Sequence, residues 1–69
     1  MRIVVSNIYH VVSDGDTYVY IVDENNGIYK RLFTEDETML LIQPQDVLDI
    51  SYIKDEDGIR RITAWKSVF

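Results

Sequence analysis

Residues 17–34, TYVYIVDENNGIYKRLFT, constrain the fold more than any other part of the chain. Two runs rich in β-branched and aromatic residues, 18–23 and 28–33, flank the dipeptide Asn26-Gly27. Such a dipeptide between two runs of this kind is the strongest short-range signal for a β-hairpin. The segment therefore predicts two paired antiparallel strands, around which the rest of the chain must be arranged.

Pairing across this turn decides which side chains share a face, because successive residues of a strand point to opposite faces. A two-residue turn places Tyr20 opposite Phe33 and Ile21 opposite Leu32, and moving the turn by one position keeps the same faces. One face is then aliphatic, with Val19, Ile21, Ile28 and Leu32. The other carries Arg31 together with the rings of Tyr18, Tyr20, Tyr29 and Phe33. We expect the aliphatic face in the core and the rings outside; the inverse assignment is the alternative.

The N-terminal part of the chain predicts a third strand in the same sheet. Residues 2–12 read as one long strand with a bend or bulge at Ser6-Asn7, and a turn at 13–16 joins this strand to the hairpin. Counting back across that turn places Tyr9 opposite Tyr20. The aromatic face thus extends over three strands.

The segment after Phe33 predicts a short helix. Residues 34–37, Thr-Glu-Asp-Glu, match a capping box ahead of an apolar run, and Pro44 ends any helix. We expect a helix over 35–42 whose Met39 and Ile42 plug the core. A strand over 39–42 is the alternative, because short apolar runs are ambiguous.

The C-terminal part predicts a second hairpin. Strands are expected over 46–54 and 59–68, joined by a tight turn at Asp57-Gly58. The pairing places Trp65 opposite Ile50, and we expect Trp65 in the core rather than on a ligand surface. All three glycines then fall at hairpin turns.

Length and composition restrict the class of protein. Sixty-nine residues without a cysteine predict one domain, residues 1–69, with no disulfide or thiolate metal site. The N-terminus lacks the apolar length of a signal peptide or a membrane span, and we expect a cytoplasmic protein. Twelve acidic against seven basic residues give a net charge of −5, which disfavours non-specific binding to nucleic acid.

Three strands, a short helix and two strands follow the order of an OB-fold, an all-β barrel of five strands. An SH3-like barrel is the runner-up. The chain resembles small OB-fold domains, including the S1-like type of bacterial translation initiation factor 1, in the strand–Asp-x-x-x-Gly–strand of residues 21–28 and in Pro-Gln-Asp-Val-Leu-Asp-Ile at 44–50. This resemblance implies a nucleic-acid surface across the second and third strands and their flanking loops.

The candidate binding surface combines the outward rings with basic side chains. In OB barrels the fifth strand lies beside the third, so Lys30, Arg31, Arg60, Arg61 and Lys66 would gather on one side. Bases stacking on rings with phosphates on cations is how proteins bind single-stranded DNA or RNA. The predicted binding residues are Tyr9, Tyr18, Tyr20, Tyr29, Arg31, Phe33, Arg60 and Lys66.

The same surface also fits a second class of function. An apolar aromatic face can bind a protein or a second copy of the chain, and a small acidic domain suits a phage or mobile-element inhibitor of a basic host protein. We expect neither an enzyme nor a cofactor: His10, the only histidine, has no apparent catalytic partner. The acidic loops at 14–16 and 55–58 do not match the spacing of a calcium loop.

Overall fold

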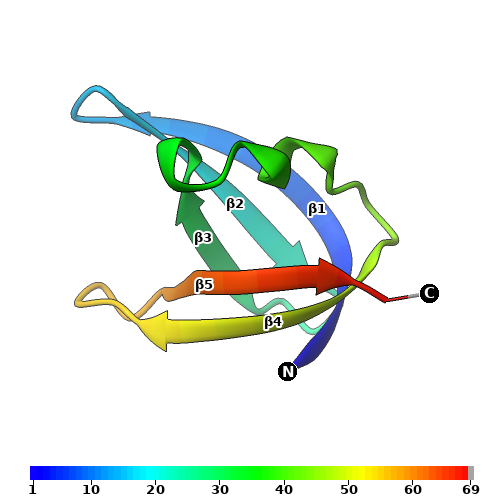
Figure 1. The fold of residues 1–69 in the computed structure, drawn as a ribbon. Coiled ribbons are helices and arrows are strands. Elements are labelled where there is room, and N and C mark those ends of the chain that lie inside the picture. Colours follow the sequence, from blue (N-terminus) through cyan, green and yellow to red (C-terminus); the bar gives the residue numbers. More distant parts are fainter. Residues whose placement is uncertain (69) are drawn as a thin grey trace.

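In the computed structural model of the protein, which describes residues 1–68, five strands form one sheet that closes into a barrel (Figure 1). The elements in chain order are β1 (Arg2–Ser13), β2 (Asp16–Asp23), β3 (Ile28–Leu32), the 3-10 helices η1 (Phe33–Glu35) and η2 (Glu37–Leu41), β4 (Val47–Lys54) and β5 (Arg60–Ser67). The order around the ring is β1-β2-β3-β5-β4, and only the β3–β5 pairing among these described strands is parallel. This arrangement confirms the predicted all-β, five-stranded OB-like barrel.

The β1–β2 hairpin has the predicted register. Tyr9 pairs with Tyr20, and the predicted bulge lies at Ser6. The turn consists of Asp14 and Gly15, whose φ angles are 51° and 82°. A two-residue turn with positive φ at both positions matches the twist of the flanking strands, and it leaves only one register open.

The β2–β3 register differs from the prediction by three positions. Tyr20 pairs with Lys30 rather than with Phe33, and Ile21 pairs with Tyr29 rather than with Leu32. Because side chains alternate between faces, an odd shift moves every β3 side chain to the opposite face. The predicted grouping of faces is therefore correct for β2 and wrong for β3.

A longer turn, organised by Asp23, causes this shift. Its Oδ1 accepts hydrogen bonds from the backbone N–H of Asn25, at 2.9 Å, and of Gly27, at 2.8 Å. Asn26 takes a φ of 64°. An Asp side chain that binds the backbone just after it favours such turns, so the reversal begins earlier than at Asn26-Gly27.

The segment after β3 forms no α-helix over residues 35–42 but the two short turns η1 and η2. Asp36, with extended angles of φ −157° and ψ 92°, separates them and is the N-cap of η2. Its side chain accepts a hydrogen bond from the Thr38 N–H at 3.0 Å, so the predicted capping box at 34–37 is wrong, as is the alternative strand. Met39 and Ile42 are buried as predicted.

The second hairpin has the expected pairing over residues 48–51, with Ile50 opposite Trp65 and Asp49 opposite Lys66, whereas residues 52–54 pair one position away from it. An unpredicted irregularity lies between Ser51 and Tyr52. The Trp65 ring is half-buried and packs against the core, which confirms its predicted place.

The core fills the interior of the barrel. Val19 and Ile21 are fully buried, so the expected orientation of β2 is confirmed. The buried hydrophobic residues are Ile3, Val5, Val19, Ile21, Tyr29, Met39, Ile42, Leu48, Ile50 and Ile62. No helix among the described residues has the length and apolar character needed to cross a membrane.

Candidate binding surface

Seven apolar or aromatic side chains lie together on the outer face of β1, β2 and β3. The strand pairings place them side by side, and the intervening β2 residues Val19 and Ile21 point into the core. None of the seven is buried, and Tyr9 and Ile28 remain 40% and 41% exposed. We call this surface the outer patch; it comprises Tyr9, Val11, Tyr18, Tyr20, Val22, Ile28 and Leu32.

The centre of the outer patch is a stacked pair of rings. The centroids of Tyr9 and Tyr20 are 5.5 Å apart, and the ring planes differ by 10°. Beside them, Lys30 Nζ lies 5.5 Å from the centroid of the Tyr18 ring. Stacked rings on a sheet present a flat, rigid surface that loses little conformational entropy when another molecule covers it.

The cations next to the outer patch are neutralised by carboxylates. Lys30 Nζ lies 2.7 Å from Asp57 Oδ2 and 3.2 Å from Asp55 Oδ2. Arg61 Nε lies 3.4 Å from Asp55 Oδ1, and its Nη1 lies 3.9 Å from Glu35. The Asp57 carboxylate, which accepts a hydrogen bond from Lys30, raises the pKa of that ammonium group. Lys30 and Arg61 are therefore ion-paired with carboxylates of the same chain.

Arg31, a predicted binding residue, does not lie on the outer patch. It pairs with Val19 on the inner face of the sheet, because of the shifted register. Its Nη1 donates a hydrogen bond to the Ile62 carbonyl, and its Nε lies 3.6 Å from Asp36 Oδ2. Asp36 Oδ2 also accepts a hydrogen bond from Trp65 Nε1 at 2.9 Å, so these groups tie the η1–η2 segment to the barrel.

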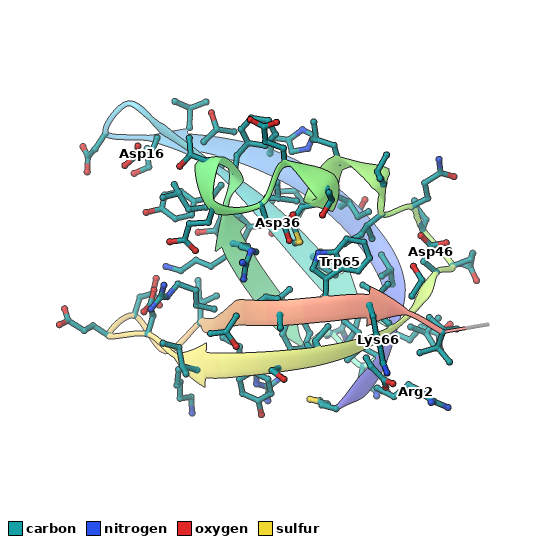
Figure 2. All side chains as sticks on the ribbon, viewed as in Figure 1. Arg2, Asp16, Asp36, Asp46, Trp65 and Lys66 are labelled. Atoms are coloured by element: carbon teal, nitrogen blue, oxygen red, sulfur yellow. The ribbon has the colours of Figure 1, made fainter. Side chains whose placement is uncertain are left out.

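Arg60, a second predicted cation, lies at the end of the barrel. Its guanidinium carbon is 5.3 Å from the Tyr29 ring centroid and 5.4 Å from that of Tyr52. The third, Lys66, is exposed on β5 opposite Asp49. Figure 2 shows Lys66 far from Asp16, which follows the β1–β2 turn. The expected gathering of cations around the rings is therefore wrong for Arg31, Arg60 and Lys66, whereas Lys30 and Arg61 do lie next to the outer patch.

Two of the predicted rings are also placed differently. Tyr29 is fully buried, because the shifted register turns it toward the core beside Ile21. Phe33 belongs to η1 rather than to a strand, and it is half-buried against the core. The rings that the structure does bring together on the outer surface are those of Tyr9, Tyr18 and Tyr20.

A buried polar network, which sequence reasoning missed, closes one end of the barrel. Tyr29 Oη donates a hydrogen bond to Asp23 Oδ2 at 2.7 Å, and Arg60 Nη1 donates to Tyr29 Oη at 3.2 Å. A Cβ atom on Gly27 would lie only 2.8 Å from Asp23 Oδ2 and 3.0 Å from each of the other two groups. The Asp-x-x-x-Gly spacing of residues 23–27 is the signal that could have predicted this contact.

Burial and hydrogen bonding shift the pKa values of this network. Burial, followed by the hydrogen bond to Asp23, raises the pKa of Tyr29 to about 12. Burial alone would raise the pKa of Asp23, but hydrogen bonds from Tyr29, Gly27 and Asn25 outweigh it and hold that pKa below its ordinary value. The network is therefore a neutral phenol bound to a carboxylate, an arrangement that stabilises the turn and the barrel end.

The fold and the outer patch define a small all-β barrel with an apolar outer surface beside an acidic turn. Comparisons of the chain with protein-family models, with curated proteins and with solved structures found no match. Within residues 1–68, no three His, Cys, Asp or Glu side chains are grouped so that they could hold a metal ion.

Proposed function

We propose that this protein is a small binding module that docks a protein partner on the outer patch. The single observation behind the proposal is that seven apolar and aromatic side chains remain partly or fully exposed on one sheet face while the neighbouring cations are paired with Asp55, Asp57 and Glu35. A contiguous apolar surface with a rigid aromatic centre is typical of a protein interface.

Charge defines the partner's chemistry. Asp14 and Asp16 are exposed at the β1–β2 turn, shortly before Tyr18 in the sequence. Glu56 is exposed in the β4–β5 turn, whose neighbouring carboxylates bind Lys30. No ion pair involves these three carboxylates in the described part of the chain. We therefore propose a partner surface with an apolar centre and Lys or Arg at its rim, since opposite charges steer association.

Single-stranded nucleic acid is the second candidate, and the exposed stacked pair Tyr9–Tyr20 favours it. Bases stack on such rings with about 1–3 kcal/mol each. Affinity for nucleic acid also depends on cations that neutralise phosphates. Because Lys30 and Arg61 are held by carboxylates, the geometry favours the protein partner.

A peptide-display selection tests the proposal. Peptides selected on the full chain are expected to combine aromatic or aliphatic residues with Lys or Arg. Tyr9→Ala and Tyr20→Ala are each expected to weaken their binding by at least about tenfold, as for aromatic residues at the centre of an interface. The matched control is Ile53→Ala, which removes an exposed apolar side chain of β4 outside the outer patch.

Equal loss of affinity in Ile53→Ala, or peptide binding that ignores both tyrosines, would contradict the proposal. The second candidate is measured in parallel by fluorescence anisotropy with a labelled single-stranded oligonucleotide at low and at high salt. If the oligonucleotide binds, and its binding weakens both at high salt and in Tyr9→Ala, nucleic acid rather than a protein is the favoured ligand of the outer patch.

A further inference from the structure

The second half of β1 is a strand edge without a neighbour. On one side, β1 pairs with β4 only through Arg2, Ile3 and Val4. Val5 adds backbone hydrogen bonds to Gln45 and Asp46, and among the described residues no backbone hydrogen bond on this side follows it. Within residues 1–68, the strand pairings of residues 7–13 all lie on the other side, with β2. The described barrel therefore leaves a strand edge of seven residues open.

The direction of the backbone groups shows what this edge offers. The Ile8 N–H donates to the side chain of Asn7 at 2.9 Å rather than to β2. Because backbone groups alternate in direction along a strand, the N–H and C=O groups of His10 and Val12 point to the same open side. Such a row of groups is a template for another strand.

Residues 7–13, Asn-Ile-Tyr-His-Val-Val-Ser, follow the bulge at Ser6 and lack the charged residues and proline that protect many natural edges. They contain no Lys, Arg, Asp, Glu or Pro, whereas the chain as a whole is 28% charged. Ile8, Tyr9, Val11 and Val12 instead favour strand pairing. An open edge of this composition is expected to be covered by another strand.

We infer that the open edge of β1 pairs with the same edge of a second copy of this chain, antiparallel and about a two-fold axis at His10. In a two-fold pair the outer faces of both copies lie on the same side of the joined sheet. Two residues that lie opposite each other across the axis therefore both have even numbers or both have odd numbers. An axis at His10 pairs all of residues 7–13. It places Tyr9 opposite Val11 of the second copy and Ile8 opposite Val12.

Matching polarity supports a second copy as the occupant. Across the axis, the aromatic Tyr9 lies opposite the β-branched Val11, and the aliphatic Ile8 lies opposite Val12. The polar Asn7 lies opposite the polar Ser13. Aromatic–β-branched pairs across strands are favourable. In this register Asp14 lies opposite Ser6 of the second copy, so the two Asp14 residues are eight positions, roughly 26 Å, apart along the strands. That exceeds the Debye length of about 8 Å, so repulsion between the two Asp14 carboxylates is largely screened.

The dimer does not rest on the proposed function, because backbone N–H and C=O groups form the strand pairing, although Tyr9 and Val11 belong to both the edge and the outer patch. It does place the outer patches of both copies on the same side of one continuous sheet. Loss of partner binding in a chain that still dimerises would count against the outer patch alone. A monomeric chain that still binds its partner would count against the dimer alone.

Sedimentation velocity of the full chain over a concentration series is the first test. We expect a species of about 16 kDa, twice 8.1 kDa, that dissociates on dilution. His10→Lys places like charges opposite each other at the axis and is expected to weaken dimerisation by at least about tenfold. Thr63→Lys, at an exposed position of β5, is the matched control and should sediment like the parent chain. A parent chain that sediments at 8.1 kDa throughout would overturn the inference.

Cross-linking tests the register, and the absence of natural cysteines makes it unambiguous. The two copies of His10→Cys would have Cα atoms about 5.5 Å apart, within the range of a disulfide. The two copies of Val12→Cys would be offset by four residues, roughly 13 Å, which is beyond it. Rapid oxidation to a dimer in His10→Cys alone supports the pairing. Equal rates in both variants, or no dimer in either, would overturn it.

Discussion

The hydroxyl of Tyr29 lies 2.7 Å from the carboxylate of Asp23, in the buried end of the barrel. Asp23 is 5% exposed and Tyr29 is fully buried, so neither group can exchange this hydrogen bond for one with water. A buried carboxylate that loses a partner carries the full cost of its desolvation. This pair therefore contributes to the stability of the β2–β3 turn rather than to a binding surface.

Tyr29→Phe is expected to lower the free energy of unfolding by about 1–3 kcal/mol, because Asp23 Oδ2 and Arg60 Nη1 each lose their hydrogen bond to the phenol. Tyr20→Phe is the matched control, since it removes the hydroxyl of a half-exposed ring on the outer patch and should cost less than about 0.5 kcal/mol. Urea denaturation of both variants measures the difference. Equal stability of the two variants would show that the buried hydrogen bond contributes nothing.

Gly27→Ala is expected to destabilise the fold by about 1–3 kcal/mol, although Gly27 is not among the residues with positive φ. The new Cβ would lie 3.0 Å from Tyr29 Oη and closer still to Asp23. Removing that hydroxyl relieves one of these contacts, so Gly27→Ala and Tyr29→Phe should cost less together than the sum of their separate costs. Additive costs in a double-mutant cycle would contradict this explanation.

Alkaline pH should destabilise the protein through Tyr29. Its folded-state pKa of about 12 lies above the ordinary value of 10.0. The fold therefore favours the neutral phenol, and the resulting stability is fully present below pH 10 and lost between pH 10 and about pH 12. Tyrosinate absorbance should show a titration at about pH 12 that Tyr29→Phe removes. If this variant keeps that titration, another group is responsible.

Acidic pH should weaken the attachment of the η1–η2 segment through Asp36. Hydrogen bonds from Thr38, followed by that from Trp65, hold the pKa of Asp36 below its ordinary value. A lowered carboxyl pKa contributes stability above the unfolded-state pKa of about 4, and this contribution is lost as the pH falls through the folded-state value. Asp36→Asn should flatten this part of the stability profile, as measured by Trp65 fluorescence during denaturation. An unchanged acid profile in this variant would exclude Asp36 as the titrating group.

Neutralising the carboxylates around Lys30 should create affinity for nucleic acid. The double substitution Asp55→Asn and Asp57→Asn releases Lys30 and removes one partner of Arg61. At low salt, oligonucleotide affinity should rise by at least about tenfold relative to the parent chain, with a steeper salt dependence. Glu24→Gln, which removes an exposed carboxylate of the β2–β3 turn that pairs with neither Lys30 nor Arg61, is the control. If the double variant gains no affinity for the oligonucleotide, the ion pairs of Lys30 and Arg61 are not what prevents nucleic-acid binding, and they no longer favour a protein partner.

The sequence alone was sufficient to predict strand pairing where a short turn allows only one register. Asp14 and Gly15 form a two-residue turn with both φ angles positive, so the pairing of Tyr9 with Tyr20 follows from counting. In the second hairpin the count gives the observed Ile50–Trp65 pair, but next to the turn the pairing differs by one position, and the irregularity between Ser51 and Tyr52 restores it. Alternation of side chains then places Val19 and Ile21 in the core and the Tyr9 and Tyr20 rings on the outside.

The face of β3 was not obtained in this way, because the turn before it is longer than the Asn26-Gly27 dipeptide indicates and is held by side-chain contacts that counting does not include. Asp23 holds that turn through its backbone hydrogen bonds, and the carboxylate is itself held by Tyr29, which Arg60 of β5 contacts. A shift of three positions reverses every side chain of the strand, so Tyr29 is in the core and Arg31 lies against β5. Composition and local pattern thus determine the strands and their order. The hydrogen bonds of the buried Asp23 carboxylate, completed by Tyr29 in the core of the barrel, decide which face of β3 meets the outside.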